Sequence, residues 1–212
     1  MAANALVAFE PRKTPIQARS AVTVESISEA TVQVLLSHGA ERLTTTRVAA
    51  RAGVSVGTLY QYYPNKKSLL FAVLENHFDH VATKVEAACE SARHKPLAEM
   101  IREMVEGFVD AKMERADISV ALYRVAGDVG GPALVKQVNQ RSRKAVEAML
   151  ETASDIKSLP DKFAIEIMLS AMAGTMRSLL EAGPSPAATV RKAREQLVLL
   201  CQSYMAAATT KR

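Results

Sequence analysis

The chain has 212 residues, enough for one large domain or for a small domain joined to a larger one, and 49% of them are hydrophobic although Trp is absent. Residues 1–67 hold eight Lys or Arg against four Asp or Glu, which suggests a partner with phosphates or an anionic surface, although a solvated basic tail would give the same excess. Two distant cysteines predict neither a disulfide framework nor a zinc site. Without a signal peptide or a run of ~18 apolar residues, we expect a soluble cytoplasmic protein with no membrane partner.

The first elements can be read in chain order. Residues 1–20 are predicted to form a flexible basic arm, because they combine two prolines and three basic residues without helical periodicity. From Val22 to His38, apolar residues recur at three-and-four spacing, which predicts an amphipathic helix that Gly39 ends. Two short helices are predicted next, over residues 45–52 and 56–63, separated by a glycine and followed by a proline that cannot continue the second one.

The remainder of the chain is helical in period. A long helix is expected from Asn65, a suitable N-cap, to about Ser91. No segment alternates with period two, so the sequence predicts an all-α fold of about nine helices. A three-helix domain is assigned to residues 21–66 and a larger helical domain to residues 67–212. The later helices are predicted at about residues 96–112, 117–128, 133–153, 161–182 and 187–208.

The two short helices meet the requirements of a helix-turn-helix. Ala49 is the small residue needed where the helices cross, and Gly53 tolerates the positive φ that the turn needs. Ser55 is placed to cap the second helix, with its hydroxyl accepting from free backbone N–H groups. The apolar residues expected to hold the pair at a fixed angle are Val48, Ala52, Val54, Leu59 and Tyr63.

The second helix carries side chains suited to a DNA major groove. Gly57 lets the backbone approach closely, Gln61 can pair with an adenine edge, and Val56 or the methyl group of Thr58 can pack on a thymine methyl. Flanking side chains are positioned to bond phosphates, and these are Tyr60, Tyr62 and Lys66. On spacing alone, an ordinary buried helix with Tyr60 and Tyr62 in the core is the alternative.

Residues 44–70, TTTRVAARAGVSVGTLYQYYPNKKSLL, resemble the DNA-binding signature of TetR-type transcriptional regulators, and the likeness covers about residues 18–72. The resemblance implies a three-helix N-terminal DNA-binding domain, an α-helical C-terminal domain, and a dimer that binds a palindromic operator in double-stranded DNA. Position by position, it implies base contacts from Thr46, Val56, Gly57, Thr58 and Gln61, and phosphate contacts from Thr45, Tyr60, Tyr62 and Lys66.

The last two predicted helices are candidates for a homodimer interface. The helix over residues 161–182 has small residues at its centre, and the helix over residues 187–208 repeats apolar residues on one side. Pairing two helices per subunit as a four-helix bundle gives an isologous dimer, as the resemblance also implies; a role in the subunit core is the alternative. The candidate residues are Ala171, Gly174, Ala193, Leu197, Leu200 and Tyr204.

The other helices of the larger domain are expected to enclose a pocket for a small, largely apolar effector. Met side chains adapt to apolar ligands of different shapes, although a Met stripe at helical spacing is more often plain core. The candidate lining residues are Phe78, Met100, Met104, Phe108, Tyr123, Met149, Met168 and Met172.

No motif in the sequence indicates catalysis or a cofactor. His77 and His80 lie one turn apart but lack a third ligand at a diagnostic spacing, so no metal is expected. No nucleophile elbow or phosphate-binding loop occurs. We therefore do not expect an enzyme, and the resemblance to TetR-type regulators implies a ligand-responsive repressor. The alternatives are an architectural DNA-binding protein without an inducer and a helical ligand-binding or catalytic protein.

Overall fold

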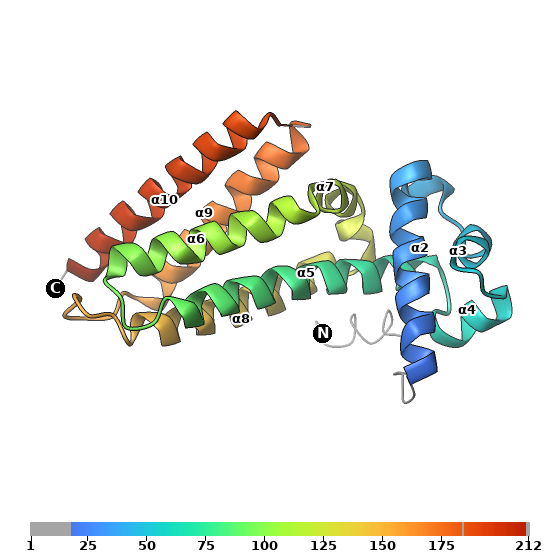
Figure 1. Ribbon diagram of the computed structural model, residues 1–212, viewed down its shortest axis with the longest axis horizontal. Coiled ribbons are helices and arrows are strands. Elements are labelled where there is room, and N and C mark those ends of the chain that lie inside the picture. Colours follow the sequence, from blue (N-terminus) through green and yellow to red (C-terminus); the bar gives the residue numbers. More distant parts are fainter. Residues whose placement is uncertain (1–17, 184, 211–212) are drawn as a thin grey trace. The chain divides into compact units, whose positions relative to one another are not determined.

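The computed structural model describes residues 18–183 and 185–210, and no strand occurs among them, so the prediction of an all-α fold is confirmed. In chain order the helices are α2 (Ala18–Arg42), α3 (Thr45–Ala52), α4 (Val56–Tyr62), α5 (Lys66–Ser91), α6 (Leu97–Glu114), α7 (Ala116–Val125), the 3₁₀ helix η1 (Ala126–Val129), α8 (Gly131–Leu150), α9 (Lys162–Glu181) and α10 (Ala187–Thr210) (Figure 1).

Two helix starts differ from the prediction. Residues 18–20 belong to α2 and not to the predicted arm, whose residues 1–17 lie outside the described part of the chain. Gly39 has a φ of 77° and breaks the helical geometry where the end was predicted. α8 begins at Gly131, before the predicted start, because the following proline is tolerated in the first turn of a helix.

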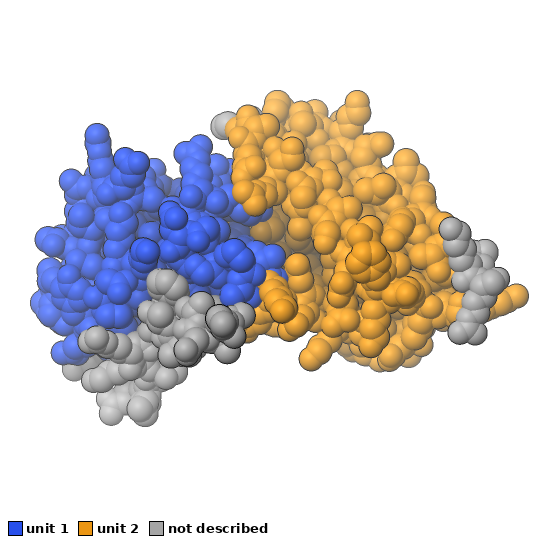
Figure 2. All heavy atoms as spheres, turned by 180° about the vertical axis from the view of Figure 1, so that it is seen from behind, with its two compact units in different colours: residues 1–78, 117–135 blue, residues 79–116, 136–212 orange. Residues whose placement is uncertain are grey.

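The chain forms two compact units, coloured separately in Figure 2. Unit 1 comprises residues 1–78 and 117–135, and unit 2 comprises residues 79–116 and 136–212. The division falls inside α5, which is one continuous helix, and not after residue 66, where the predicted DNA-binding domain ends.

The core of unit 1 lies between the helices that carry the predicted DNA-binding motif. α2 packs against α3, and α3 packs against α4. The side chains of Ile27, Val48 and Leu59, one from each helix, are fully buried. Also within unit 1, the buried His77 Nε2 lies 2.9 Å from Ser119 Oγ, a hydrogen bond that joins the first half of α5 to α7.

The core of unit 2 is rich in methionine. α6, α9 and α10 pack on one another in this unit. Both cysteines are free thiols in the same buried cluster, and burial raises the pKa of Cys89 to about 12 and that of Cys201 to about 11, so neither forms a thiolate at neutral pH. The buried methionines are Met100, Met104, Met149, Met168, Met172, Met176 and Met205.

α9 is long and apolar enough, by length and composition, to cross a membrane, although the sequence was expected to contain no such segment. A core helix of a globular protein satisfies the same criteria. One side of α9 is buried in this structure, through Ile165, Met168, Met172, Met176 and Leu180. The membrane criteria are therefore weak evidence for a membrane span here.

The crossing of α5 and α6 depends on Gly107. A Cβ atom added there would lie 2.7 Å from the Cβ of Ala88, closer than real Cβ atoms approach. Gly107→Val should therefore lower the free energy of unfolding by about 1–3 kcal/mol through overpacking, measured by urea denaturation. Gly127→Ala is the control, because a Cβ there meets no atom within 4 Å. An unchanged urea midpoint for Gly107→Val would contradict the close crossing.

Candidate nucleic-acid interface

The α3–turn–α4 pair is fixed by local caps. Thr44 Oγ1 accepts a hydrogen bond from the Arg47 N–H at 3.2 Å, and Ser55 Oγ accepts one from the Thr58 N–H at 2.9 Å. Both satisfy backbone donors that have no partner inside a helix. Gly53 ends α3 in the left-handed conformation, with φ 68° and ψ 27°, which favours glycine. Gly53 therefore forms the turn and Ser55 caps α4, as predicted.

The inner side of the pair is apolar. Val48, Ala49 and Leu59 are buried, whereas Ala52 and Val54 are half-buried. Tyr63 is only 2% exposed, and burial, with a smaller contribution from the Glu75 carboxylate, raises its pKa to about 12. The core tyrosine of this motif is therefore Tyr63.

The outer side of the pair presents the residues predicted to contact bases. Val56, Gly57 and Gln61 are exposed on α4, and Thr46 is exposed on α3. Thr58 is half-buried, and its hydroxyl lies 2.8 Å from Ser55 Oγ. The start of α4 is therefore accessible along the side on which the sequence placed the base contacts.

Two hydroxyl groups lie together beside this surface. Tyr60 is 43% exposed, and its hydroxyl lies 3.1 Å from Thr45 Oγ1. Tyr62 is half-buried. The exposure of Tyr60 argues against the alternative in which it fills the core. Hydroxyl groups at such a partly exposed position are suitable donors to a phosphate oxygen.

The start of α5 adds positive charge near the end of α2. Asn65 Oδ1 accepts from the Ser68 N–H at 3.0 Å, and the Ser68 hydroxyl donates to the Asn65 carbonyl at 2.7 Å, which fixes the first turn. Lys66 Nζ donates to the Glu41 carbonyl at 3.4 Å. A helix N-terminus with a lysine beside it favours a bound anion.

Two arginines of α3 that the sequence did not single out brace the motif against α2. Arg47 Nη1 donates to the Arg42 carbonyl, and Arg51 Nε donates to Gln33 Oε1 at 2.6 Å. Gln33 lies 18 residues before Arg51, and only the packing of α2 on α3 brings the two together. No local sequence signal could have revealed this contact.

The predicted effector residues fall in two places. Phe78 is buried and Tyr123 is half-buried, and both belong to unit 1. The other six lie in the buried cluster of unit 2, and they are Met100, Met104, Phe108, Met149, Met168 and Met172. Their burial fits a plain core as well as the lining of an effector pocket.

The predicted dimer residues do not all share one surface. Gly174, Leu200 and Tyr204 are exposed, and Ala171 and Ala193 are half-buried. Leu197 is 2% exposed and packs in the core of its own subunit, which is the alternative to a dimer contact for this residue. Exposed apolar residues that the sequence analysis missed are Leu159, Phe163, Ile167 and Leu199. The four-residue spacing of Phe163, Ile167 and Ala171 places them on one side of α9, and this spacing could have indicated the surface from the sequence.

Neither histidine of α5 lies in a metal cluster. His80 Nε2 lies 2.7 Å from Glu114 Oε2, whereas His77 bonds Ser119. Within residues 18–183 and 185–210, no three His, Cys, Asp or Glu side chains are grouped so that they could hold a metal ion.

Known families match both parts of the chain. Residues 27–73 match the family described as bacterial regulatory proteins, tetR family, and residues 96–205, more than half of the chain, match the tetracyclin repressor-like C-terminal domain. The chain belongs to the TetR family. It is therefore a transcriptional regulator with a helix-turn-helix DNA-binding domain, and not an enzyme.

Individual relatives agree with this assignment. Nucleoid occlusion factor SlmA of Pasteurella multocida is 38% identical over 77 residues, which cover 32% of this chain and 39% of SlmA. The transcriptional repressor KstR of Mycolicibacterium smegmatis is 39% identical over 62 residues, 29% of this chain and 30% of KstR. The matches thus span less than half of either relative. A TetR-family regulator structure from Mesorhizobium loti superposes with a TM-score of 0.72 at 15% identity, covering 90% of this chain and 98% of that one, and shows the shared fold.

Proposed function

We propose that this TetR-family regulator binds a palindromic DNA operator as a homodimer in the cytoplasm and represses transcription until a small molecule releases it. The observation that carries the proposal is the accessible start of α4, where Val56, Gly57 and Gln61 are exposed beside the paired hydroxyls of Thr45 and Tyr60. Side chains of this kind combine base-edge contacts with phosphate contacts.

The roles of the exposed residues follow from their chemistry. Gln61 has the amide that pairs with an adenine edge, while Val56 offers a methyl surface to thymine. Tyr60, Tyr62 and Lys66 have donors for phosphate oxygens, which fix the position of α4 without reading sequence. Base and phosphate contacts therefore differ in how their loss depends on DNA sequence and on salt.

Gln61→Ala should cost about 1–3 kcal/mol of operator binding and relax the preference at one base position in each half-site. Lys66→Ala should weaken binding to all sequences about equally and reduce the slope of log K against log salt by about one. Fluorescence anisotropy with single-base operator variants at several salt concentrations measures both effects. A uniform loss across sequences for both variants would contradict the division of roles.

The dimer proposal rests on an apolar stripe of exposed and half-buried residues along α9 and α10. Phe163 is 66% exposed and Ile167 42%, and together with Ala171 and Gly174 they recur every three or four residues along α9. Leu200 and Tyr204 add one turn of α10, which packs beside α9. An added Cβ at Gly174 meets no atom within 4 Å, so a helix of a second copy has room to approach. We call these six residues the α9–α10 face.

A groove at one end of the α9–α10 face supports the same assembly. It measures about 720 Å³ and is lined by Ser158, Leu159, Pro160, Asp161, Ala164, Tyr204, Ala207 and Ala208. An exposed aromatic side chain and a groove of mixed polarity on one surface suit an isologous interface, in which each copy contributes both. A dimer has two α4 helices, one for each of two successive major grooves ~34–36 Å apart, whereas a monomer has one.

The release mechanism combines the effector residues of unit 2 with α5. We propose that a largely apolar molecule enters among the buried Met side chains and favours a conformation in which α5 shifts, changing the separation of the two α4 helices. Such coupling requires the ligand to prefer one of two states. Operator and ligand bound together to one dimer at full affinity would contradict it.

An architectural DNA-binding protein without an inducer is the second candidate, and the likeness to a nucleoid occlusion factor supports it, whereas the likeness to a repressor supports regulation. The two differ in their response to small molecules. Competition of a compound library against a selected operator separates them: release by a compound supports the regulator, and release by none supports the architectural protein.

A further inference from the structure

Arg141, on α8, binds two carboxylates of α5. Its Nε and Nη2 donate to Glu86 Oε1 and Oε2 at 3.0 and 2.9 Å, and its Nη1 donates to Asp79 Oδ1. A planar guanidinium held by both oxygens of a carboxylate fixes the orientation of its partner as well as the distance. The hydrogen bonds that Arg141 donates, mainly to Glu86 and then to Asp79, raise its pKa above its ordinary value.

The two carboxylates lie at the start of the part of α5 that belongs to unit 2. Asp79 is the first residue of α5 that belongs to unit 2, and Glu86 follows it by seven residues, about two helical turns, on the same side of the helix. Contacts two turns apart fix both the rotation of a helix about its axis and its position along that axis. Arg141 therefore holds α5 at the point where this helix passes from one unit to the other.

α8 connects Arg141 to the core of unit 2. Val146, Met149 and Leu150, within three turns of Arg141 on the same helix, are buried in the cluster that also contains Met168 and Met172. Protein cores are close-packed, so a ligand that repacks this cluster displaces the helices that line it. A displacement of α8 is passed to α5 wherever the two are tied rigidly.

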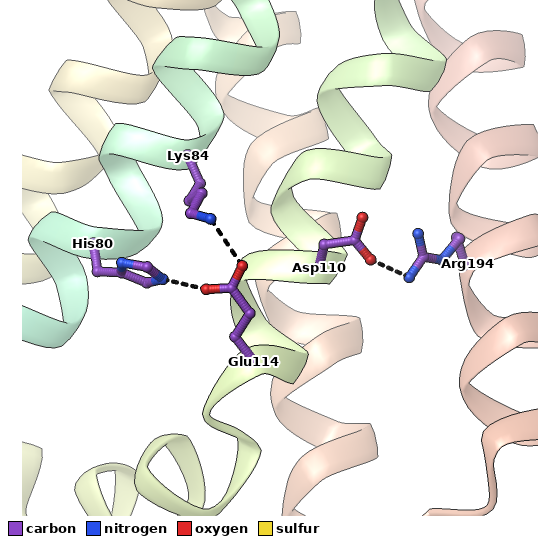
Figure 3. A network of polar contacts seen from close by, with 5 residues as sticks. All are labelled: His80, Lys84, Asp110, Glu114 and Arg194. Atoms are coloured by element: carbon purple, nitrogen blue, oxygen red, sulfur yellow. Dashed lines mark hydrogen bonds and ion pairs between the residues drawn. The ribbon is translucent and has the colours of Figure 1, made fainter.

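A second polar link to α5 in unit 2 is less rigid. Figure 3 shows Glu114 of α6 accepting from His80 at 2.7 Å and from Lys84 at 2.8 Å, one bond from each side chain. All three side chains are more than 40% exposed. Single-point bonds between exposed side chains leave rotation free and contribute little. Arg141 and Glu86 are only 35% and 36% exposed and share two parallel bonds, so this pair ties α5 more firmly than the α6 network does, whereas Asp79, at 62% exposed, adds less.

We infer that Arg141 is a positioning residue that couples the core of unit 2 to α5, so that ligand binding in the core and operator binding at α4 influence each other through α8. This inference rests on the proposed function, because it names the residue through which that regulation runs. Coupling between two sites is reciprocal, so operator binding must alter α8 if a ligand near α8 alters operator binding. Operator DNA can therefore test the coupling before any effector is known.

The test is hydrogen exchange of α8 peptides, residues 131–150, with and without an operator selected from random DNA. Arg141→Met keeps an apolar stem and removes the fork, and Arg141→Lys keeps the charge without the fork. Arg143→Met is the matched control, because Arg143 bonds Glu147 and Glu166 but no residue of α5. Thermal melting establishes that each variant is folded.

In the wild type and in Arg143→Met, operator binding should change the exchange of α8 at least twofold. In both Arg141 variants, the operator should still bind while the change in α8 falls within error. An undiminished change in Arg141→Met, or no operator-dependent change in the wild type, would overturn the coupling role. Failure to select any operator with the wild type is a different result, because it would overturn the DNA-binding function on which the inference rests.

Discussion

Ile167→Glu should convert the proposed dimer into monomers and lower operator affinity by about 10²–10³-fold. A charge placed in the α9–α10 face must be desolvated when two copies meet, which removes the favourable free energy of the interface. A monomer has a single α4 and binds one half-site, so it loses the high effective concentration of the second. Analytical ultracentrifugation measures the assembly, and anisotropy measures binding to the palindrome.

Val135→Glu is the matched control for this substitution. Val135 lies on α8, is also apolar and 42% exposed, and is not part of the α9–α10 face. It should remain a dimer with unchanged affinity. A dimeric Ile167→Glu that binds the palindrome as tightly as the wild type would place the interface elsewhere.

Lys112→Met should raise the free energy of unfolding at pH 7 by as much as about 3 kcal/mol. Lys112 lies on α6 with a side chain that is 6% exposed, and burial lowers its pKa from 10.5 to about 8. Between those two pH values the unfolded chain binds a proton at Lys112 that the folded chain does not, so the contribution of this residue to stability rises with pH across this window. Below pH 8 the full cost of burying the charge is present.

Urea denaturation at pH 7 and at closely spaced pH values from 8 to 10.5 measures this effect. Above pH 9 the buried Cys89 and Cys201 thiols lower the stability of both proteins, so the difference between the two proteins isolates the effect of Lys112. The extra stability of Lys112→Met over the wild type should be largest at pH 7 and should shrink as the pH rises from 8 to 10.5. Lys144→Met, at an exposed position on α8, is the control and should leave the pH dependence unchanged. A stability difference between Lys112→Met and the wild type that does not change with pH would contradict the role of this buried amine.

Local signals made the DNA-binding motif predictable from the sequence. The bounds of α3 agree with the prediction because a threonine cap precedes it and Gly53, in the left-handed conformation, follows it. The start of α2 was missed because Arg19 and Ser20 add no apolar periodicity. The exposed side of α4 was predictable because its few apolar residues define which side packs inward.

The two other surfaces depend on tertiary contacts that periodicity does not specify. α9 and α10 are apolar on more than one side, so the sequence could not decide that Leu197 packs inward while Leu200 is exposed. Arg141 binds carboxylates 55 and 62 residues before it, and no local pattern connects them. The spacing of the methionines does not show which of them line an effector pocket, because core methionines follow the same helical spacing. The sequence therefore does not identify an effector either.

The central claim is tested most directly by selecting binding sites from random double-stranded DNA with the purified protein. We expect enrichment of a palindrome with half-sites centred about one helical turn, or a multiple of it, apart, bound by one dimer. Absence of any enriched sequence at moderate salt, from protein that is folded and dimeric, would contradict sequence-specific operator recognition by α4.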